Sequence, residues 1–364
     1  MDCSSRRRLG RALATKKSSV GDSAARVPDL TGTLDPGDVV LAVSCLAGPT
    51  AARALRVVAK ATCRATNEVL PVVLASCPAL LYVCGGCGPS SGVGSKEQGE
   101  FFHPATAAWE VLPSGSTRCE GIAAAAIAGR LYLCGGFSGT RYMNKAMSYD
   151  PSNGVWETLP RMSTRRGGAA AAAVGGRLYV CGGFRGIQRL SSAECYDPVA
   201  NSWSDIASMS ERRGSAAAAA VSRQLYVCDG FDGRNFLNSV ERFHPAIGSW
   251  TALPPMTVCR TGAAAATVSG VLYVCGGFHV LTFLGSVERF DPEVGAWEAM
   301  PGMKMRRMGA AAASIGGHIY MCGGSDGTRY LSSVECFDPE HNDWELLPPM
   351  SQVRRGAAAV ALVP

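Results

Sequence analysis

Tryptophan recurs at a constant interval along most of this chain. The six Trp residues follow one another every 47 residues, at Trp109, Trp156, Trp203, Trp250, Trp297 and Trp344. A Tyr-x-Cys-x-Gly motif recurs with them, at Tyr82, Tyr132, Tyr179, Tyr226, Tyr273 and Tyr320. A fixed period of this length indicates a repeat architecture, in which each unit buries its apolar surface against its neighbours. The chain is therefore expected to contain six similar units.

Each unit divides into four short apolar segments. In the third unit these are residues 169–174, 177–181 and 193–196 and a strand around Trp203. Gly-Gly, Asp-Pro and Met-x-x-Arg sequences separate the segments and favour turns. Four short strands per unit are typical of a propeller blade. We therefore predict an all-β fold over residues 81–364, a six-bladed β-propeller with four antiparallel strands per blade.

Alanine runs are the one local feature that opposes strands. Alanine has the highest helix propensity of any residue type, and it fills the runs at 123–126, 169–173 and 216–220. We nevertheless expect strands, because six blades leave room only for small side chains around a central channel. Flanking Gly residues also confine each run to a length at which an isolated helix is unstable.

The C-terminal end of the chain holds a seventh copy of the alanine-rich strand, at residues 355–360. We expect this copy to pair with residues 81–84 of the first unit and close the ring. Closure would leave no blade with an exposed inner edge. Residues 69–75 compete for the same place, but they lack the Arg-x-Gly that precedes the C-terminal copy.

The sequence resembles the Kelch repeat family. The resemblance rests on the Gly pair of Tyr-x-Cys-Gly-Gly, on the Tyr two residues before its Cys, and on the downstream Trp. It covers residues from about 81 to 364, although the fourth copy reads Cys228-Asp229-Gly230. It implies the propeller fold and a role in binding other proteins.

The repeat also predicts which side chains share a face. Strand direction alternates within a blade, so the loop after the second strand should emerge beside the loop that joins two blades, opposite the Asp-Pro turns. An Arg stands ten residues after five of the Trp residues, at Arg166, Arg213, Arg260, Arg307 and Arg354, and Arg118 lies near this place in the first unit. Aromatic residues expected on the same face are Tyr142, Phe231, Phe236, Phe283 and Tyr330.

Two interpretations of these residues remain open. Kelch domains of ubiquitin-ligase substrate receptors commonly bind acidic peptide segments on this face, so the resemblance implies that the Arg and aromatic residues contact a partner. Guanidinium groups pair with carboxylates and phosphates in bidentate fashion, which fits an acidic or phosphorylated segment. The alternative is that an Arg repeated in every blade ties neighbouring blades together, and that the aromatic residues pack beneath their own loops.

Residues 34–67 differ from the blades and carry a helical pattern that resembles an F-box. The matching positions expected to contact an adaptor are Leu34, Pro36, Val40, Leu41 and Leu55. The resemblance implies docking of a Skp-type adaptor and, through it, a cullin. A plain helical hairpin packed against the propeller is the alternative. Residues 1–33 are expected to be a disordered basic tail, and residues 68–80 a linker.

These observations favour a protein-binding Kelch adaptor, acting as a substrate receptor of a cullin-type ubiquitin ligase. The alternative is a cytoskeletal or scaffold interaction module without a ubiquitin role. We expect no enzyme activity, since the sialidase Asp-box is absent and the five His residues are scattered. No cofactor and no metal site are expected, because the Cys84-Gly-Gly-Cys87 pair has no second pair to complete a zinc site.

The distribution of charge excludes a general nucleic-acid binder. The net charge is +6, but residues 1–33 carry seven Lys or Arg and three Asp, which leaves the rest of the chain nearly neutral. Phosphate binding needs a concentrated basic surface. The longest apolar stretch is interrupted by Pro71 and Pro78, so no membrane span is expected. We expect a cytoplasmic or nuclear protein with reduced cysteines.

Overall fold

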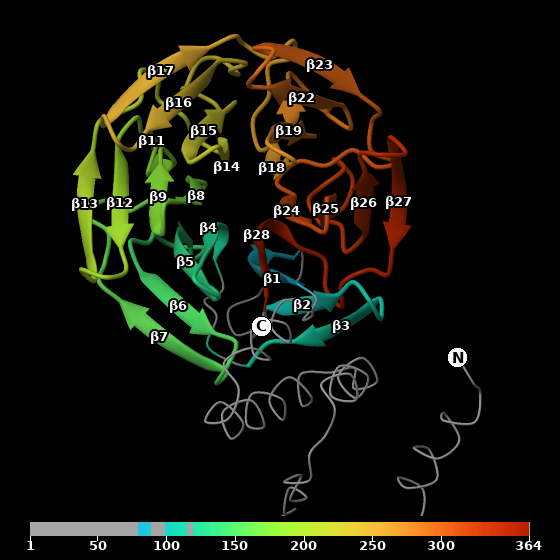
Figure 1. Cartoon of the computed structure of the whole chain (residues 1–364), viewed down its shortest axis with the longest axis horizontal. Helices are drawn as coiled ribbons and strands as arrows, with labels where there is room; N and C mark the ends of the chain where they lie inside the picture. The colour runs from blue at the N-terminus through green and yellow to red at the C-terminus, as the bar shows by residue number, and fades with distance from the viewer. Residues whose placement is uncertain (1–78, 89–98, 114, 116–118, 364) are drawn as a thin grey trace, which may run out of the picture. The chain divides into compact units, whose positions relative to one another are not determined.

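The computed structural model describes residues 79–88, 99–113, 115 and 119–363. These residues form six four-stranded antiparallel sheets arranged around a central axis (Figure 1). The predicted six-bladed propeller is therefore confirmed, and the described residues contain no helix. The basic tail, the F-box-like segment and most of the linker lie outside the described residues. Leu80, assigned to the linker, already belongs to the first strand.

The strands of each blade run in order from the central axis to the rim. Blade 1 contains β28 (Arg355–Leu362), β1 (Leu80–Cys87), β2 (Glu100–His103) and β3 (Ala108–Val111), and blade 2 contains β4 (Glu120–Ile127), β5 (Arg130–Phe137), β6 (Ala146–Asp150) and β7 (Val155–Leu159). Blade 3 contains β8 (Ala170–Val174), β9 (Arg177–Cys181), β12 (Ala193–Asp197) and β13 (Ser202–Ile206), and blade 4 contains β14 (Ala217–Val221), β15 (Gln224–Cys228), β16 (Val240–His244) and β17 (Ser249–Leu253). Blade 5 contains β18 (Ala264–Val268), β19 (Val271–Cys275), β22 (Val287–Asp291) and β23 (Ala296–Met300), and blade 6 contains β24 (Ala311–Ile315), β25 (His318–Cys322), β26 (Val334–Asp338) and β27 (Asp343–Leu347).

The two ends of the propeller meet in blade 1. Strand β28 pairs antiparallel with β1 in a register that runs from Leu80 opposite Leu362 to Cys87 opposite Arg355. The two strands lie side by side in Figure 1. This confirms the expected closure by the C-terminal strand. The competing residues 69–75 lie outside the described residues.

The alanine runs form the innermost strands, as expected. In β8 the side chains alternate, with Ala170, Ala172 and Val174 buried and the two Ala residues between them half-buried. The buried set belongs to a core cluster that includes Leu225 and Val227 of the next blade. Each hydrophobic core therefore lies between two neighbouring blades, and this packing overrides the helix propensity of alanine.

The repeated Trp residues connect each blade to the blade before it. Every indole N–H donates a hydrogen bond to a backbone carbonyl near the end of the preceding blade: Trp109 to Pro348, Trp156 to Pro113, Trp203 to Pro160, Trp250 to Ala207, Trp297 to Pro254 and Trp344 to Pro301. Trp344 is buried and the other five Trp residues are half-buried, and an indole N–H in such a place needs an acceptor. The bond from Trp109 reaches back to blade 6 and so spans the closure.

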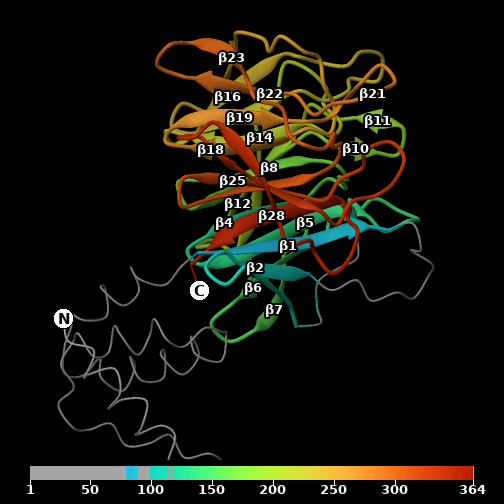
Figure 2. The same cartoon turned by 90° about the vertical axis from the view of Figure 1, so that its right-hand side faces the viewer.

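Two surfaces of the ring are used below under fixed names. The hairpin face carries the loops after the second strands, at residues 137–142, 184–189, 231–236, 278–283 and 325–330. Two of these loops form small hairpins, β10 (Phe184–Arg185) with β11 (Gln188–Arg189) and β20 (Phe278–His279) with β21 (Thr282–Phe283). The turn face carries the turns at residues 151–154, 198–201, 245–248, 292–295 and 339–342. In Figure 2 the labels β10, β11 and β21 lie on the right, and the C terminus lies on the left.

Candidate functional site

The five repeated arginines are inside the protein. Their exposed fractions are 1% or less, and each forms an ion pair with a buried Glu on the third strand of the blade that follows: Arg166 with Glu194, Arg213 with Glu241, Arg260 with Glu288, Arg307 with Glu335 and Arg354 with Glu100. These side chains present no surface to a partner. The expectation that they line the binding face is corrected accordingly, and the alternative of an interblade tie fits their contacts.

Arg307 shows how the tie works. Its Nε and Nη2 donate to the Glu335 carboxylate at 3.0 and 2.9 Å, and its Nη1 donates to the carbonyl of Gly323 at 2.6 Å. Glu335 also accepts the backbone N–H of Lys304 at 2.7 Å, which fixes the segment between the blades. The backbone carbonyl of Arg307 accepts the N–H of Gly277 in blade 5 at 2.7 Å. One residue thus connects blade 5 through its backbone and blade 6 through its side chain.

A second sequence signal identifies the partner of these arginines. A Glu follows the Arg by 28 residues in four of the pairs, and ring closure provides the fifth. Blade 2 lacks both members, because Cys119 and Met147 occupy the corresponding positions and are 3% and 4% exposed. The loss of the Arg together with its Glu in one blade indicates that the two side chains pair with each other inside the protein. The interpretation of the sequence did not use this signal. Arg118 lies outside the described residues.

The fourth Tyr-x-Cys motif departs from Gly-Gly at Asp229. At the corresponding Gly182, φ is +64° and a Cβ would lie 2.4 Å from the carbonyl oxygen of Arg213, so the turn favours Gly. Asp229 adopts φ 59° at this place and is fully buried. Its carboxyl accepts the N–H of Ala217 in blade 4 at 2.8 Å and that of Ala263 in the next blade at 3.2 Å. Burial nevertheless raises the pKa of Asp229 well above its ordinary value.

The raised pKa of Asp229 predicts a pH-dependent stability. Because the folded pKa lies above the unfolded value of 3.8, ionisation disfavours the fold, and stability rises as pH falls from the folded pKa towards 3.8. Asp229→Gly restores the repeat motif and should remove this contribution. Relative to the variant, the wild-type protein should gain stability on acidification through that window. Urea unfolding of both proteins across pH measures the difference, and a difference that is constant with pH would contradict the assignment.

The predicted aromatic residues lie on the hairpin face, but each is half-buried. They pair across their own loops, with ring centroids 4.9 Å apart for Phe137 and Tyr142, 5.2 Å for Phe231 and Phe236, and 5.1 Å for Phe278 and Phe283. Tyr330 lies beneath the Arg355 guanidinium at 5.7 Å. These aromatic residues therefore support the loops from below and leave the tips of the loops as the outermost surface.

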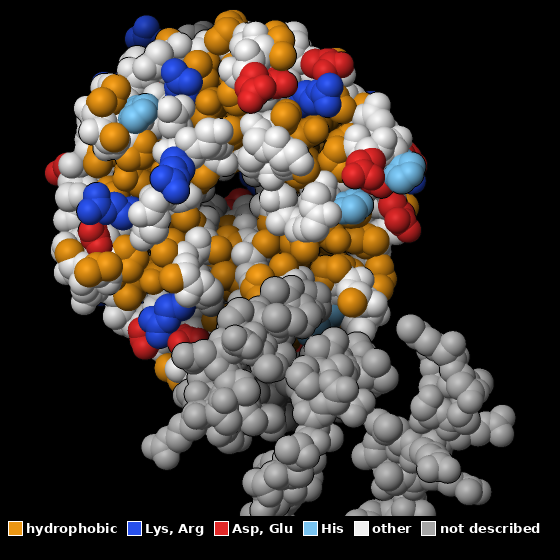
Figure 3. Space-filling view, in the orientation of Figure 1, with side chains coloured by type: hydrophobic (Ala, Val, Ile, Leu, Met, Phe, Trp, Pro, Cys, Tyr) orange, Lys and Arg blue, Asp and Glu red, His pale blue; other side chains and the backbone are white. Residues whose placement is uncertain are grey.

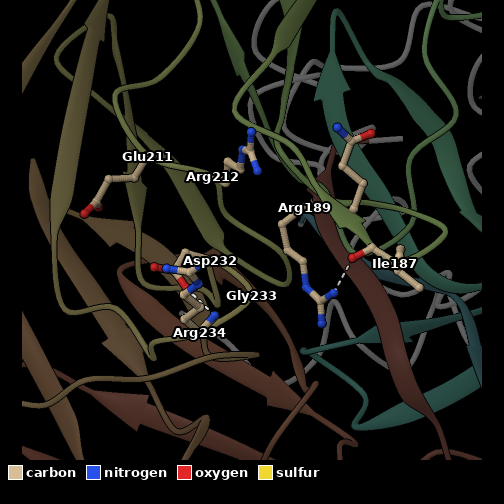
Figure 4. A pocket seen from close by; sticks show the side chains of 8 residues that line it. Ile187, Arg189, Glu211, Arg212, Asp232, Gly233 and Arg234 are labelled. Atoms are coloured by element: carbon tan, nitrogen blue, oxygen red, sulfur yellow. Dashed lines mark hydrogen bonds between the residues drawn. The ribbon is translucent and has the colours of Figure 1, made fainter.

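A shallow pocket of about 480 Å³ opens on the hairpin face between blades 3 and 4 (Figure 4). Its lining residues are Ile187, Gln188, Arg189, Glu211, Arg212, Asp232, Gly233 and Arg234. The Arg189 guanidinium lies between two aromatic rings, 5.1 Å from the centroid of Phe184 and 5.2 Å from that of Phe231. Stacking of this kind orients the group and leaves its edge for a planar anion.

The carboxylates of this pocket are already engaged. Asp232 accepts the backbone N–H groups of Asn235 and Arg234, which lower its pKa and keep it ionised. Glu211 accepts Arg213 at 3.0 Å and the hydroxyl of Ser239. Within the described residues no ion pair is formed by Arg212 or Arg234, nor by the exposed Arg165, Arg185 and Arg306. The arginines exposed on this face therefore remain available to an external anion.

On the opposite surface, basic side chains do not predominate. Figure 3 looks onto the side that carries the C terminus, and there basic, acidic and histidine side chains are interspersed around the central opening. The Asp residues of the turns serve their own loops: Asp150, Asp197 and Asp291 each accept the backbone N–H two residues later. These carboxylates therefore stabilise turns.

The repeated Cys residues are structural. Burial raises the pKa of Cys84, Cys134, Cys181, Cys275 and Cys322 to about 12 and raises that of Cys228 as well. The thiolate is the reactive form, so these six thiols should be inert at neutral pH. We expect iodoacetamide to spare all six in the native protein and to modify them after unfolding, as measured by peptide mass spectrometry. Native modification would show that the blades open more readily than this packing allows.

No cluster with the composition of a metal site occurs in the described residues.

Comparison with known proteins agrees with this geometry. Residues 72–259 match the family described as the KLHDC2/KLHL20/DRC7 Kelch-repeats domain. The chain belongs to this Kelch-repeat family. Residues 259–304 and 306–351 each match the Kelch motif. No curated protein matches the chain. Kelch propellers generally bind protein partners and generally act without catalysis. Within the described residues, no helix has the length and apolar character needed to cross a membrane.

Proposed function

We propose that this Kelch propeller is a protein-binding module whose hairpin face holds an acidic or phosphorylated segment of its partner. The observation that supports the proposal is the set of exposed arginines between blades 3 and 4, beside carboxylates that already have internal partners. Arginine and aromatic side chains are enriched at the energetic centres of interfaces. Guanidinium groups also form paired hydrogen bonds to carboxylate and phosphate.

Charge reversal on the two faces tests this proposal. Peptides selected from a random display library on the full chain should be enriched in Asp and Glu. Arg212→Glu should weaken their binding about tenfold, which corresponds to about 1.4 kcal/mol. Arg223→Glu is the matched control, because Arg223 is an exposed residue of the β14–β15 turn, away from the hairpins. Selected peptides without acidic residues, or equal binding to both variants, would contradict the proposal.

The role proposed for the bound partner is delivery to a cullin-type ubiquitin ligase. The support is the F-box-like pattern of residues 34–67, which would recruit a Skp-type adaptor while the propeller holds the target. An adaptor at one end of a chain and a target at the other is the arrangement that a substrate receptor requires.

Co-purification with a Skp-type adaptor tests this role separately from target binding. The intact chain should retain the adaptor, and a chain lacking residues 1–67 should lose it while still binding the selected acidic peptides. Retention by neither form would indicate an interaction module of the scaffold type, without a ubiquitin role.

A further inference from the structure

The hairpin-face loops that the structure describes, those of blades 2 to 6, fall into two chemical kinds. The loops of blades 2, 4 and 6 have polar tips, at residues 138–141, 232–235 and 326–329. The loops of blades 3 and 5 have aliphatic tips that point into solvent. Ile187 is 92% exposed at the turn between β10 and β11, and Val280 and Leu281 are 59% and 90% exposed at the turn between β20 and β21. Val199 on the turn face is 97% exposed as well, so what distinguishes these tips is their backbone conformation and their position beside the pocket lined by Arg189, Arg212 and Arg234, and not exposure alone.

The tip of blade 5 is held in an unfavourable backbone conformation. Strands β20 and β21 pair at His279 and Thr282, so Val280 and Leu281 are the two central residues of the turn. Both have positive φ, 35° and 67°, as a type I′ turn requires. Asn-Gly is the favoured pair for this turn, and positive φ is rare for bulky and β-branched residues. The chain therefore places aliphatic residues here against both the solvent and the backbone preference.

Packing below the tip keeps this conformation in place. The rings of Phe278 and Phe283 lie 5.1 Å apart across the hairpin. Phe236 of blade 4 contacts the edges of Phe278 and His279, with centroids 5.8 and 5.7 Å away. Backbone strain that persists on a rigid support is a feature of recognition sites.

The two aliphatic tips flank the pocket between blades 3 and 4, which is lined by Arg189, Arg212 and Arg234. Ile187 belongs to the pocket lining, and its carbonyl accepts a hydrogen bond from Arg189, which holds this tip beside the guanidinium (Figure 4). On the other side, the aromatic contacts of Phe236 join the loop that carries Asp232 and Arg234 to the hairpin of Val280 and Leu281. The order around the ring is therefore aliphatic, basic, aliphatic.

We propose that the hairpin face over blades 3 to 5 selects an acidic segment that also carries apolar side chains, which contact Ile187 on one side of the arginines and Leu281 on the other. This inference rests on the proposed function and specifies its ligand. Acidic residues of the segment meet the arginines of the pocket, and its apolar residues cover the two tips. We assign a protein segment and not an anionic bilayer to this face, because Kelch propellers generally bind protein partners.

A paired variant separates this inference from the proposed function. Val280→Asn with Leu281→Gly supplies the residues that the turn favours, so the protein should melt at a higher temperature than the wild type. Peptides selected from a random display library on the full-length wild-type chain should be rich in both acidic and apolar residues. They should bind the variant at least about tenfold more weakly, as expected for loss of a buried aliphatic contact. Ile187→Ser should also weaken the binding of these peptides.

The outcomes of this experiment distinguish failure of the inference from failure of the proposed function. Acidic peptides without apolar enrichment, bound equally by the variant, would overturn the inference and leave the proposed function standing. Peptides without acidic residues would overturn both. Vesicles of phosphatidylserine and phosphatidylcholine serve as the second probe. Sedimentation of the wild-type protein with these vesicles, lost in the variant, would show that the tips insert into lipid and would overturn the peptide ligand.

Discussion

Arg307→Ala is expected to lower the free energy of unfolding by about 3–5 kcal/mol, the usual cost of removing one member of a buried ion pair. The substitution leaves the Glu335 carboxylate fully buried without its cation. It also removes the donor to the carbonyl of Gly323, a buried acceptor that would lose this bond. Urea or thermal unfolding monitored by tryptophan fluorescence provides the measurement.

The neighbouring Arg306 provides a matched control. Its side chain is exposed, and Arg306→Ala should change the free energy of unfolding by less than about 0.5 kcal/mol. Blade 2 suggests a second control, because Cys119 and Met147 replace the pair there. Arg307→Cys combined with Glu335→Met should therefore lose less stability than either substitution alone, since no buried charge remains unpaired. Equal losses for Arg306→Ala and Arg307→Ala would refute the interblade role.

Removal of residues 355–364 is expected to abolish cooperative folding of the propeller. Strand β28 provides the innermost strand of blade 1 and pairs with β1 along its whole length. Without it, the inner edge of β1 is exposed and the contact between blades 1 and 6 is reduced. An unpaired edge of this kind also promotes aggregation. The truncated chain should elute as aggregate in gel filtration and should show no sharp thermal transition.

A shorter truncation controls for the loss of chain length. Removing residues 363 and 364 leaves β28 intact, because the strand ends at Leu362. This form should unfold like the intact protein. A monomeric protein with a sharp transition after removal of residues 355–364 would mean that another segment closes the ring.

The fold could be predicted from the sequence because its determinants repeat. The Trp at every 47th residue donates the same interblade hydrogen bond six times, so the spacing directly reports the blade. The same regularity allowed the alanine runs to be predicted as strands, although alanine itself favours helices. Closure by the C-terminal strand could be predicted because residues 355–360 copy the inner strand, and the register of β28 with β1 agrees.

The binding site was harder to predict, since repetition marks structure more strongly than function. The five arginines stood out because every copy keeps them, and the structure shows that a buried Glu takes up each guanidinium. The residues that now carry the proposed function vary between blades. Arg212 is exposed beside the buried Arg213, and the tip residues Val280 and Leu281 break the Gly pattern of the other loops. The burial of each arginine and the sign of φ at each loop tip distinguish structural residues from candidate binding residues. Neither quantity can be read from a single sequence.

Hydrogen–deuterium exchange of the full chain, with and without a peptide selected from the random library, tests most directly which surface binds a partner. The proposed binding face predicts slower exchange at residues 185–188, 232–235 and 279–282 when the peptide is present, with no change in the turns at 198–201 and 245–248. Slower exchange in those turns, with the hairpin loops unchanged, would contradict the hairpin face as the site of protein binding.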